Sequence, residues 1–351
     1  MATSSARRRA VERLERLGGA SLDDEAVRRA ALDVLRTALP FGAWSWATSD
    51  PASQLAVSAL AEHPFERGML DLLCAEEDPL EVNRRSVLAR ARSPVAALSI
   101  STHGHLERSR RWREQFDAYA VADELRIVFA DRTGCWGYLD LYAFGATQYG
   151  EDEIRVAHAF ARLLTPALRR ASAPPRAMRH VADMRDPAVI LVGCDLRVRA
   201  QTGPASRWLS QLRSGAHQPL PCAVLAATAR AIGAADDAAA VVRERCADGQ
   251  WATVRAARLD TGGVAVTVEH SAPRDVLDYL ARAVALTRRE RDVLSLLFTG
   301  HDTRSVAERL VISPGTVHDH VKSILAKTGH SSRRELAASV VIPDRGGHVP
   351  M

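Results

Sequence analysis

The 351-residue sequence lacks any hydrophobic run close to the roughly eighteen apolar residues that a membrane-spanning helix needs. The basic residues Arg7, Arg8 and Arg9 are not followed by the apolar segment of a secretory signal. These absences argue against a membrane-spanning helix and against export. We therefore expect a soluble, cytoplasmic protein with no membrane partner.

Cysteine is also scarce. The sequence contains Cys74, Cys135, Cys194, Cys222 and Cys246, which are odd in number and widely spaced, without a C-x-x-C pair. This pattern excludes a disulfide framework and a zinc module. It favours small buried side chains in a reducing compartment.

No strong excess of one charge marks the chain. Lysine and arginine together number 47 and aspartate and glutamate 42, which gives a net charge of +5. This balance permits nucleic-acid binding but does not by itself argue for it. The length indicates two or three domains, and the composition, 47% hydrophobic and 25% charged, is that of globular proteins.

The first half of the chain combines helix and strand patterns. Ser21 is expected to open a helix that runs to Thr37. The segment Arg126–Phe144 predicts two strands joined by a turn at Asp131–Gly134, and a long helix is expected from Glu151, bent near its end by Pro166. Helix, strands and helix predict an α+β domain.

A second block follows a candidate linker at Ser172–Pro175. Its strand patterns lie at Ala188–Gln201, with a central turn, and at Val241–Glu269, where two turns separate three strands. Helices are expected near Ala205–Leu212 and Cys222–Ile232. These elements predict a second small α+β domain, which a further candidate linker at His270–Asp275 ends.

After this point every segment is typical of helix. Its start and stop signals are a capping box at Thr287 and Glu290, a stop at Gly300, a cap at Asp302, a cap at Ser313 followed by Pro314, a stop at Gly329, and a start at Ser332 with Glu335. Two short helices joined by a tight turn, the second with a polar face, predict a helix-turn-helix.

The helix after Ser313 carries the histidines His318 and His320. An apolar stripe of Val317, Val321, Ile324 and Leu325 indicates a helix, with Thr316, Asp319, Lys322 and Ser323 on its outer side and His318 at the edge. Residues two apart on a helix point to roughly opposite sides, whereas a helical metal pair needs a spacing of three or four. We therefore expect no metal site here.

The segment Leu286–Leu336 resembles the DNA-binding domain of LuxR-type bacterial transcription regulators. The resemblance includes an L-T-x-R-E-x-x-V-L opening, an I/V-A-x-x-L scaffold helix, an S-x-x-T-V-x-x-H-V recognition helix and a K-x-G-x-x-S/R close. It implies a recognition helix in the major groove of double-stranded promoter DNA. The DNA-binding residues that it implies are Thr303, Arg304, Ser313, Thr316, Val317, His318, Asp319, His320, Lys322 and Lys327. Phosphate contacts are expected from Thr303, Arg304 and Lys327, and base-edge contacts from Thr316, Val317, His318 and Lys322.

The resemblance also implies a homodimer, paired through Arg333, Leu336, Ala337 and Val340. Three residues depart from the pattern of the family: His318 replaces a frequent Lys, Ser305 a Glu or Gln, and Thr328 a Leu. The first departure affects the expected DNA sequence preference, and the other two affect local packing.

The earlier blocks resemble a GAF domain and a PAS-like domain, an order familiar in actinobacterial regulators. The GAF resemblance depends on the hairpin with GCWGYLDLY and the long helix after it. The resulting organisation is an N-terminal extension (1–19), an α+β GAF-like domain (20–171), a linker (172–187), an α+β PAS-like domain (188–270), a connecting helix (271–285), an all-α four-helix LuxR-type domain (286–342) and a tail (343–351). Relatives of the two sensory folds either hold a small-molecule ligand or only pair subunits, and no residue here identifies a ligand.

The sequence thus predicts a cytoplasmic transcription regulator whose GAF-like and PAS-like domains sense or relay a signal. RNA polymerase would be a partner if the protein activates transcription. A signalling enzyme is disfavoured because no catalytic constellation is present, and we expect no enzyme activity and no cofactor. A scaffold whose helix-turn-helix binds protein instead of DNA stays open as the alternative.

Overall fold

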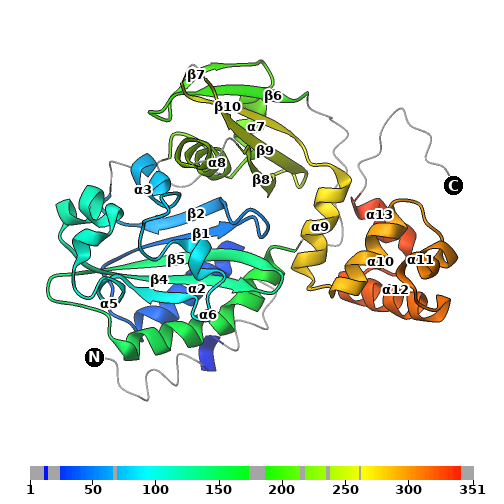
Figure 1. The fold of residues 1–351 in the computed structure, drawn as a ribbon, viewed down its shortest axis with the longest axis horizontal. Helices are drawn as coiled ribbons and strands as arrows, with labels where there is room; N and C mark the ends of the chain where they lie inside the picture. Colours follow the sequence, from blue (N-terminus) through cyan, green and yellow to red (C-terminus); the bar gives the residue numbers. More distant parts are fainter. Residues whose placement is uncertain are drawn as a thin grey trace. The chain divides into compact units, whose positions relative to one another are not determined.

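The computed structural model describes residues 12–14, 24–65, 69–173, 186–213, 218–234, 238–260 and 262–340. Contacts between Cα atoms divide the chain into two compact units. One unit holds the two β-sheets of the described chain, and the other holds the helices that follow residue 271 (Figure 1).

The first sheet has the strand order β2-β1-β5-β4-β3, and every neighbouring pair is antiparallel. Its strands are β1 (Ala43–Ser49), β2 (Ala56–Glu62), β3 (Val95–Ala97), β4 (Val121–Asp131) and β5 (Gly134–Phe144). The long helix α6 (Glu151–Ala171) packs on β4, and α2 (Asp24–Arg36) packs beside it (Figure 1). The rings of Trp46, Phe129 and Phe160 meet in this layer, with centroids 5.2, 6.0 and 6.1 Å apart.

Short elements connect β2 to β4. They are α3 (Met69–Ala75), α4 (Arg85–Leu88), α5 (Leu98–Ser101), the 3-10 turns η1 (Leu106–Arg108) and η3 (Asp117–Tyr119), and the π-helical turn η2 (Trp112–Phe116). These elements supply several of the charged side chains described below.

The second sheet has the order β7-β6-β10-β9-β8, also fully antiparallel. Its elements are β6 (Ala188–Val192), β7 (Val198–Gln201), α7 (Ala205–Gln211), α8 (Cys222–Gly233), β8 (Ala240–Arg245), β9 (Trp251–Arg258) and β10 (Val264–His270). Counted along the chain, both sheets therefore share one strand order: second, first, fifth, fourth, third. The helix α8 contacts β8 and β9 of the second sheet and also β2 and α3 of the first, so most of its side chains are buried.

The strand predictions for both sheets are confirmed, including the turns within Arg126–Phe144 and Ala188–Gln201. Strand patterns were readable because β-branched and aromatic residues are separated by Asp and Gly turns. The predicted helix start at Ser21 lies outside the described residues, and the helix is described from Asp24. Pro166 lies inside α6, which continues to Ala171.

The linker predicted at His270–Asp275 falls at the boundary between the two units, between His270 and Ser271, but it is shorter than predicted. His270 ends β10 and Pro273 already begins the next helix, because proline is favoured at a first helical position. The linker predicted at Ser172–Pro175 extends beyond the described residues, as do the N-terminal extension in large part and the tail.

From Ser271 onward the elements of the second unit are the helices α9 (Pro273–Ala283), α10 (Arg288–Phe298), α11 (Thr303–Leu310), α12 (Pro314–Thr328) and α13 (Arg333–Val340). Three predicted N-caps are confirmed by hydrogen bonds: Thr287 accepts from Glu290 N–H at 3.2 Å, Asp302 from Ser305 N–H at 2.8 Å, and Ser313 from Thr316 N–H at 3.0 Å. Gly329 ends α12 in the left-handed conformation, as expected. None of the described helices combines the length and apolar composition needed to cross a membrane.

Candidate nucleic-acid interface and a buried polar cavity

Helices α11 and α12 form a helix-turn-helix around the turn at residues 311–313. Val311 ends α11 with a φ of 55°, and 89% of its surface is exposed. The left-handed region crowds the side chain of a β-branched residue, so Val311 is strained. The N–H of Ile312 donates to the carbonyl of Ala307 at 3.0 Å and closes the turn.

One face of α12 holds the domain together. Val317, Val321 and Ile324 are buried and Leu325 is half-buried. Because α12 contacts α10 and α11, this stripe packs in the core of the helical unit, as the sequence predicts.

The other face of α12 brings together most of the predicted DNA-binding residues. Ser313, His318, Asp319 and Lys322 are exposed, and Thr316 and His320 are half-buried. Lys322 forms no hydrogen bond or ion pair with any residue that the structure describes. Its ammonium group is therefore available to donate to a phosphate or a base edge.

Val317 was expected to contact base edges, but its side chain is completely buried in the helical core. The contact of Val317 with base edges remains a prediction from the family resemblance, although its side chain has no exposed surface with which to make that contact. The periodicity of α12, which placed Val317 on the apolar stripe, indicated its position correctly.

Lys327, an expected phosphate contact, lies beside a buried carboxylate. Its Nζ is 2.7 Å from both carboxylate oxygens of Glu290, and the hydroxyl of Ser323 donates to the same carboxylate at 2.6 Å. Burial by itself raises the pKa of Glu290, but hydrogen bonds from Lys327, Ser323 and Thr287 lower it to about 2. Glu290 thus joins α10 to α12. The capping box identified this residue, although nothing in the sequence indicated that it binds Lys327.

The expected phosphate contacts on α11 differ in their surroundings. Arg304 is exposed and donates to Glu308 at 3.2 Å. The hydroxyl of Thr303 accepts from Nη1 and Nη2 of Arg333 at 3.4 and 3.3 Å.

The residues expected to pair two subunits lie on α13. Leu336 is buried within the single chain, Ala337 is half-buried, and Arg333 is exposed. The side chain of Val340 lies outside the described residues. The pairing of two subunits through this helix stays a prediction.

A second polar site lies in the first sheet. Side chains alternate along a strand, so Leu125, Ile127 and Phe129 of β4 occupy the apolar face, whereas Glu124 and Arg126 occupy the other. The register of β4 with β5 sets Arg126 opposite Asp140 and Glu124 opposite Tyr142. This alternation of charged residues within an apolar strand was a readable signal that the sequence reasoning missed.

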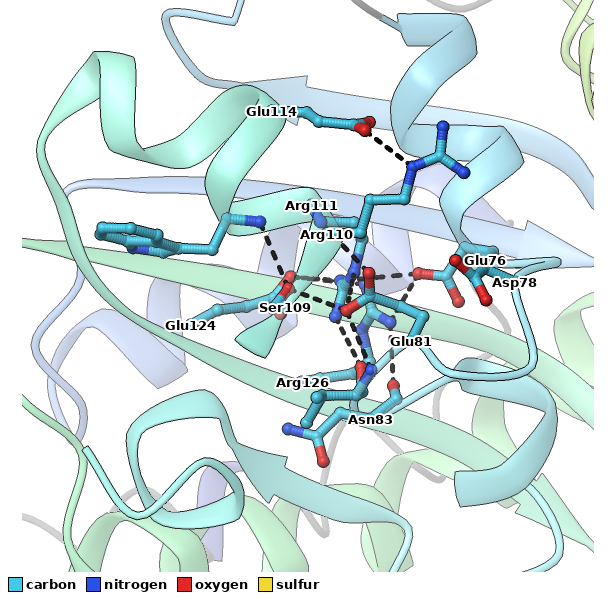
Figure 2. A network of polar contacts seen from close by, with 12 residues as sticks. Glu76, Asp78, Glu81, Asn83, Ser109, Arg110, Arg111, Glu114, Glu124 and Arg126 are labelled. Atoms are coloured by element: carbon cyan, nitrogen blue, oxygen red, sulfur yellow. Dashed lines mark hydrogen bonds and ion pairs between the residues drawn. The ribbon is translucent and has the colours of Figure 1, made fainter. Parts of the chain in front are cut away.

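Buried ion pairs connect these strands to the short elements (Figure 2). Arg126 is 2.7 Å from Asp140 and 2.6 Å from Glu76, and Arg111 is 2.9 Å from Glu124. Arg85 is 2.6 Å from Asp140 and stacks on the ring of Tyr138, 3.8 Å from its centroid.

The charges around this cluster shift the pKa values of its carboxylates in different directions. Burial by itself raises the pKa of Glu76, but Arg126, Arg85 and Arg111 together lower it to about 2. Asp140 also has a pKa below its usual range because the attraction of Arg126 and Arg85 outweighs burial. For Glu124 burial dominates, and its pKa is raised.

This polar face borders a cavity of about 80 Å³. Its charged wall is formed by Glu76, Arg85, Arg111, Arg126 and Asp140. The rest of the lining includes Leu72 and Leu73 of α3, Leu225 and Ala226 of α8, and the aromatic rings of Phe65, Phe116 and Tyr142, the last on the same sheet face as Asp140. Among the described residues, no group of three or more His, Cys, Asp or Glu side chains is arranged to hold a metal ion.

Comparison with known proteins places the family resemblance at the C-terminal end. Residues 284–340 match the model of the LuxR family of bacterial regulatory proteins. A putative helix-turn-helix transcriptional regulator of Aeromonas salmonicida is 49% identical over 51 residues, which are 14% of this chain. The chain spans about a quarter, 26%, of the length of that relative.

The chain is also similar to solved structures, at low sequence identity. SdiA of Escherichia coli is 11% identical, with 97% of this chain and 99% of that chain covered and a TM-score of 0.34. A ligand and DNA complex of VqmA from Vibrio cholerae is 20% identical, with 44% and 80% covered and a TM-score of 0.21. Neither structure superposes closely. Residues 284–340 are similar to the LuxR family of bacterial regulatory proteins, and α11 and α12 within them form a helix-turn-helix.

Proposed function

We propose that this protein is a sequence-specific transcription regulator that binds promoter DNA as a homodimer and acts in the cytoplasm. The exposed polar face of α12 carries the proposal, since it presents His318, Asp319 and Lys322 on a helix whose other face is anchored in the core. A helix of this kind fits the major groove, where side chains reach base edges. The LuxR family match over the same residues supports this role.

We further propose that the two sheets form the sensory part, as GAF-like and PAS-like domains. Their shared strand order and the cavity in the first sheet support a ligand-binding or relay role. A ligand shifts the DNA affinity only if it binds one signalling state better than the other. No catalytic activity is part of this proposal.

The proposal is tested by mapping the genomic sites of the tagged full-length protein and measuring its affinity for those sites by electrophoretic shift. Lys322→Ala is expected to weaken binding about tenfold, because a base contact contributes about 1–3 kcal/mol. The control is Arg274→Ala, which removes one exposed positive charge from α9 in the same unit without changing α12.

Equal loss of affinity in both variants would show that only net charge matters. Absence of any shift on the mapped sites would instead favour the scaffold, in which the helix-turn-helix binds protein. A base contact by Lys322 changes one position of the preferred sequence, whereas a phosphate contact weakens binding to all sequences alike.

A further inference from the structure

We propose that the cavity of the first sheet binds a small, neutral heteroaromatic molecule that carries a hydrogen-bond acceptor. This inference rests on the proposed sensory function and names the class of ligand for that site.

Two tyrosine hydroxyls beside the cavity have no hydrogen-bond partner among the described residues. Tyr138 and Tyr142 are 6% and 4% exposed and line the cavity. Neither hydroxyl forms a hydrogen bond with a residue that the structure describes. Burial raises the pKa of Tyr138 to about 12 and that of Tyr142 well above its usual value, so both hydroxyls keep their protons and remain donors. Buried donors are normally satisfied, and an acceptor in the cavity would satisfy them.

The charged wall disfavours an ionic ligand. The guanidinium groups of Arg85 and Arg126 are each within 2.7 Å of Asp140, and Arg111 is 2.9 Å from Glu124. These pairs compensate the arginines, so an anion would gain little attraction and would face the carboxylates of Glu76 and Asp140. A cation would face three guanidinium groups. A neutral molecule avoids both penalties.

The shape of the cavity favours a flat ring. Phe65, Phe116 and Tyr142 form an aromatic cluster with centroids 4.9–5.3 Å apart. Aromatic walls interact with the faces and edges of a planar ring. The volume of about 80 Å³ is smaller than the cavity of about 150 Å³ that holds benzene in a dry protein core, so the ligand has about six nonhydrogen atoms or fewer unless the walls move.

The position of the cavity links the ligand to the second sheet. Gln218 precedes α8 and lines the cavity together with Cys222, Leu225 and Ala226 of that helix. Since α8 also packs against β8 and β9, a molecule in the cavity contacts a helix that belongs to the core of the second sheet. A molecule in the cavity therefore lies against the first sheet and against a helix that packs on the second.

The test is a ligand-observed NMR titration of the full-length protein with four probes of similar size. Pyrazole is the neutral heteroaromatic probe, and benzene lacks the acceptor. Acetate carries a negative charge, and tetrahydrofuran is an acceptor without a flat ring. We expect pyrazole to bind at least threefold more tightly than each of the others.

Matched variants locate the site. Tyr142→Phe and Tyr138→Phe each remove a cavity hydroxyl and are expected to weaken pyrazole binding at least threefold. Tyr149→Phe is the control, because the Tyr149 hydroxyl is also buried and unpaired among the described residues but does not line the cavity. This control is expected to leave the affinity for pyrazole unchanged.

The inference is overturned if pyrazole does not bind, if acetate, benzene or tetrahydrofuran binds as tightly, or if all three variants behave alike. Circular dichroism verifies that each variant is folded, and either cavity tyrosine alone suffices for the test. DNA binding by the unliganded protein is measured separately. A protein that binds its mapped DNA but not pyrazole contradicts only this inference, whereas one that binds pyrazole but no DNA contradicts the proposed regulator.

Discussion

Glu290 of α10 holds Lys327 of α12 through both of its carboxylate oxygens, each 2.7 Å from Nζ. Glu290 is 4% exposed and also caps its own helix by accepting the N–H of Thr287 at 2.6 Å. One carboxylate therefore caps α10 and fixes the C-terminal part of α12. Since this pair engages Lys327, we expect Lys322 to have the larger electrostatic role in the proposed binding of DNA.

The first prediction concerns Glu290→Gln. We expect the helical unit to lose about 1–3 kcal/mol of unfolding free energy at pH 7, because the variant leaves Lys327 without its charged partner. Thermal unfolding, with the transition assigned to the helices by hydrogen exchange, measures the loss. Glu308→Gln is the control: it changes an exposed i, i+4 pair with Arg304 and should cost less than about 0.5 kcal/mol.

We also predict that the stability of the helical unit falls at acidic pH, because Glu290 has a lowered pKa. We call this decrease the acid limb. The pKa of Glu290 is about 2 in the folded protein and has its ordinary value near 4.5 in the unfolded chain. The stabilisation is therefore complete above about pH 4.5 and is lost as the pH falls through about 2. The Gln variant should lack this limb, and an unchanged acid limb in that variant would exclude Glu290 as its source.

A second prediction concerns the strained turn. Val311→Asn should raise the stability of the helical unit by about 1 kcal/mol, because asparagine tolerates positive φ better than a β-branched residue. It also removes an exposed apolar side chain. Val311→Ala serves as the comparison, since alanine removes the apolar bulk without favouring the left-handed conformation. Equal unfolding temperatures for the two variants would show that the backbone strain is negligible.

A third prediction concerns Glu244 of β8, which is 2% exposed. Its carboxyl accepts the N–H of Arg213 at 2.6 Å, and its second oxygen has no partner among the described residues. Burial raises its pKa to about 8, although the backbone and charge of Arg213 oppose the shift. The folded state thus binds a proton that the unfolded state releases above about pH 4.5.

This linkage makes the stability of the sheet unit fall as the pH rises from about 4.5 to 8. Glu244→Gln keeps a neutral side chain of the same shape and should flatten that slope, which makes the variant more stable than the parent at pH 8. Chemical unfolding at pH 5 and pH 8 measures the effect. Glu269→Gln, at an exposed pair with Arg255, should leave the slope unchanged.

The fourth prediction concerns His318, a position at which the LuxR-type resemblance implies a frequent lysine. His318→Lys adds a full positive charge to the exposed face of α12. Binding to a mapped operator should tighten, and the slope of log affinity against log salt should steepen by about one if the new ammonium contacts a phosphate. Affinity measurements at several salt concentrations decide this. An unchanged affinity together with an unchanged slope would place His318 away from DNA.

The sequence predicted the helices and strands better than the contacts between them. Helices α10 to α12 were predicted because their caps Thr287, Asp302 and Ser313 act locally, within one turn. The strands β6 to β10 were likewise marked by turn residues. Local signals of this kind do not depend on the rest of the fold.

Associations between distant segments could not be predicted in this way. Glu76, Arg111 and Arg126 are separated by tens of residues and meet only after the short elements fold over the first sheet. The alternation of Glu124 and Arg126 on β4 predicts a shared face, but not the partners that would be buried with them. The same limit applies to Glu290 and Lys327, which lie on different helices.

The most direct test of whether α12 binds DNA uses the lysines of the protein. Lys322 and Lys327 are the only lysines of the sequence, so a lysine-selective acetylating reagent modifies α12 and the terminal amine. We predict that Lys322, exposed and unpaired among the described residues, reacts quickly in the free protein and that a mapped operator fragment protects it at least fivefold, while an unrelated fragment at moderate salt protects it less. Mass spectrometry quantifies the modification, with the terminal amine as internal reference. Equal reactivity of Lys322 with and without the operator would contradict the claim that α12 binds DNA.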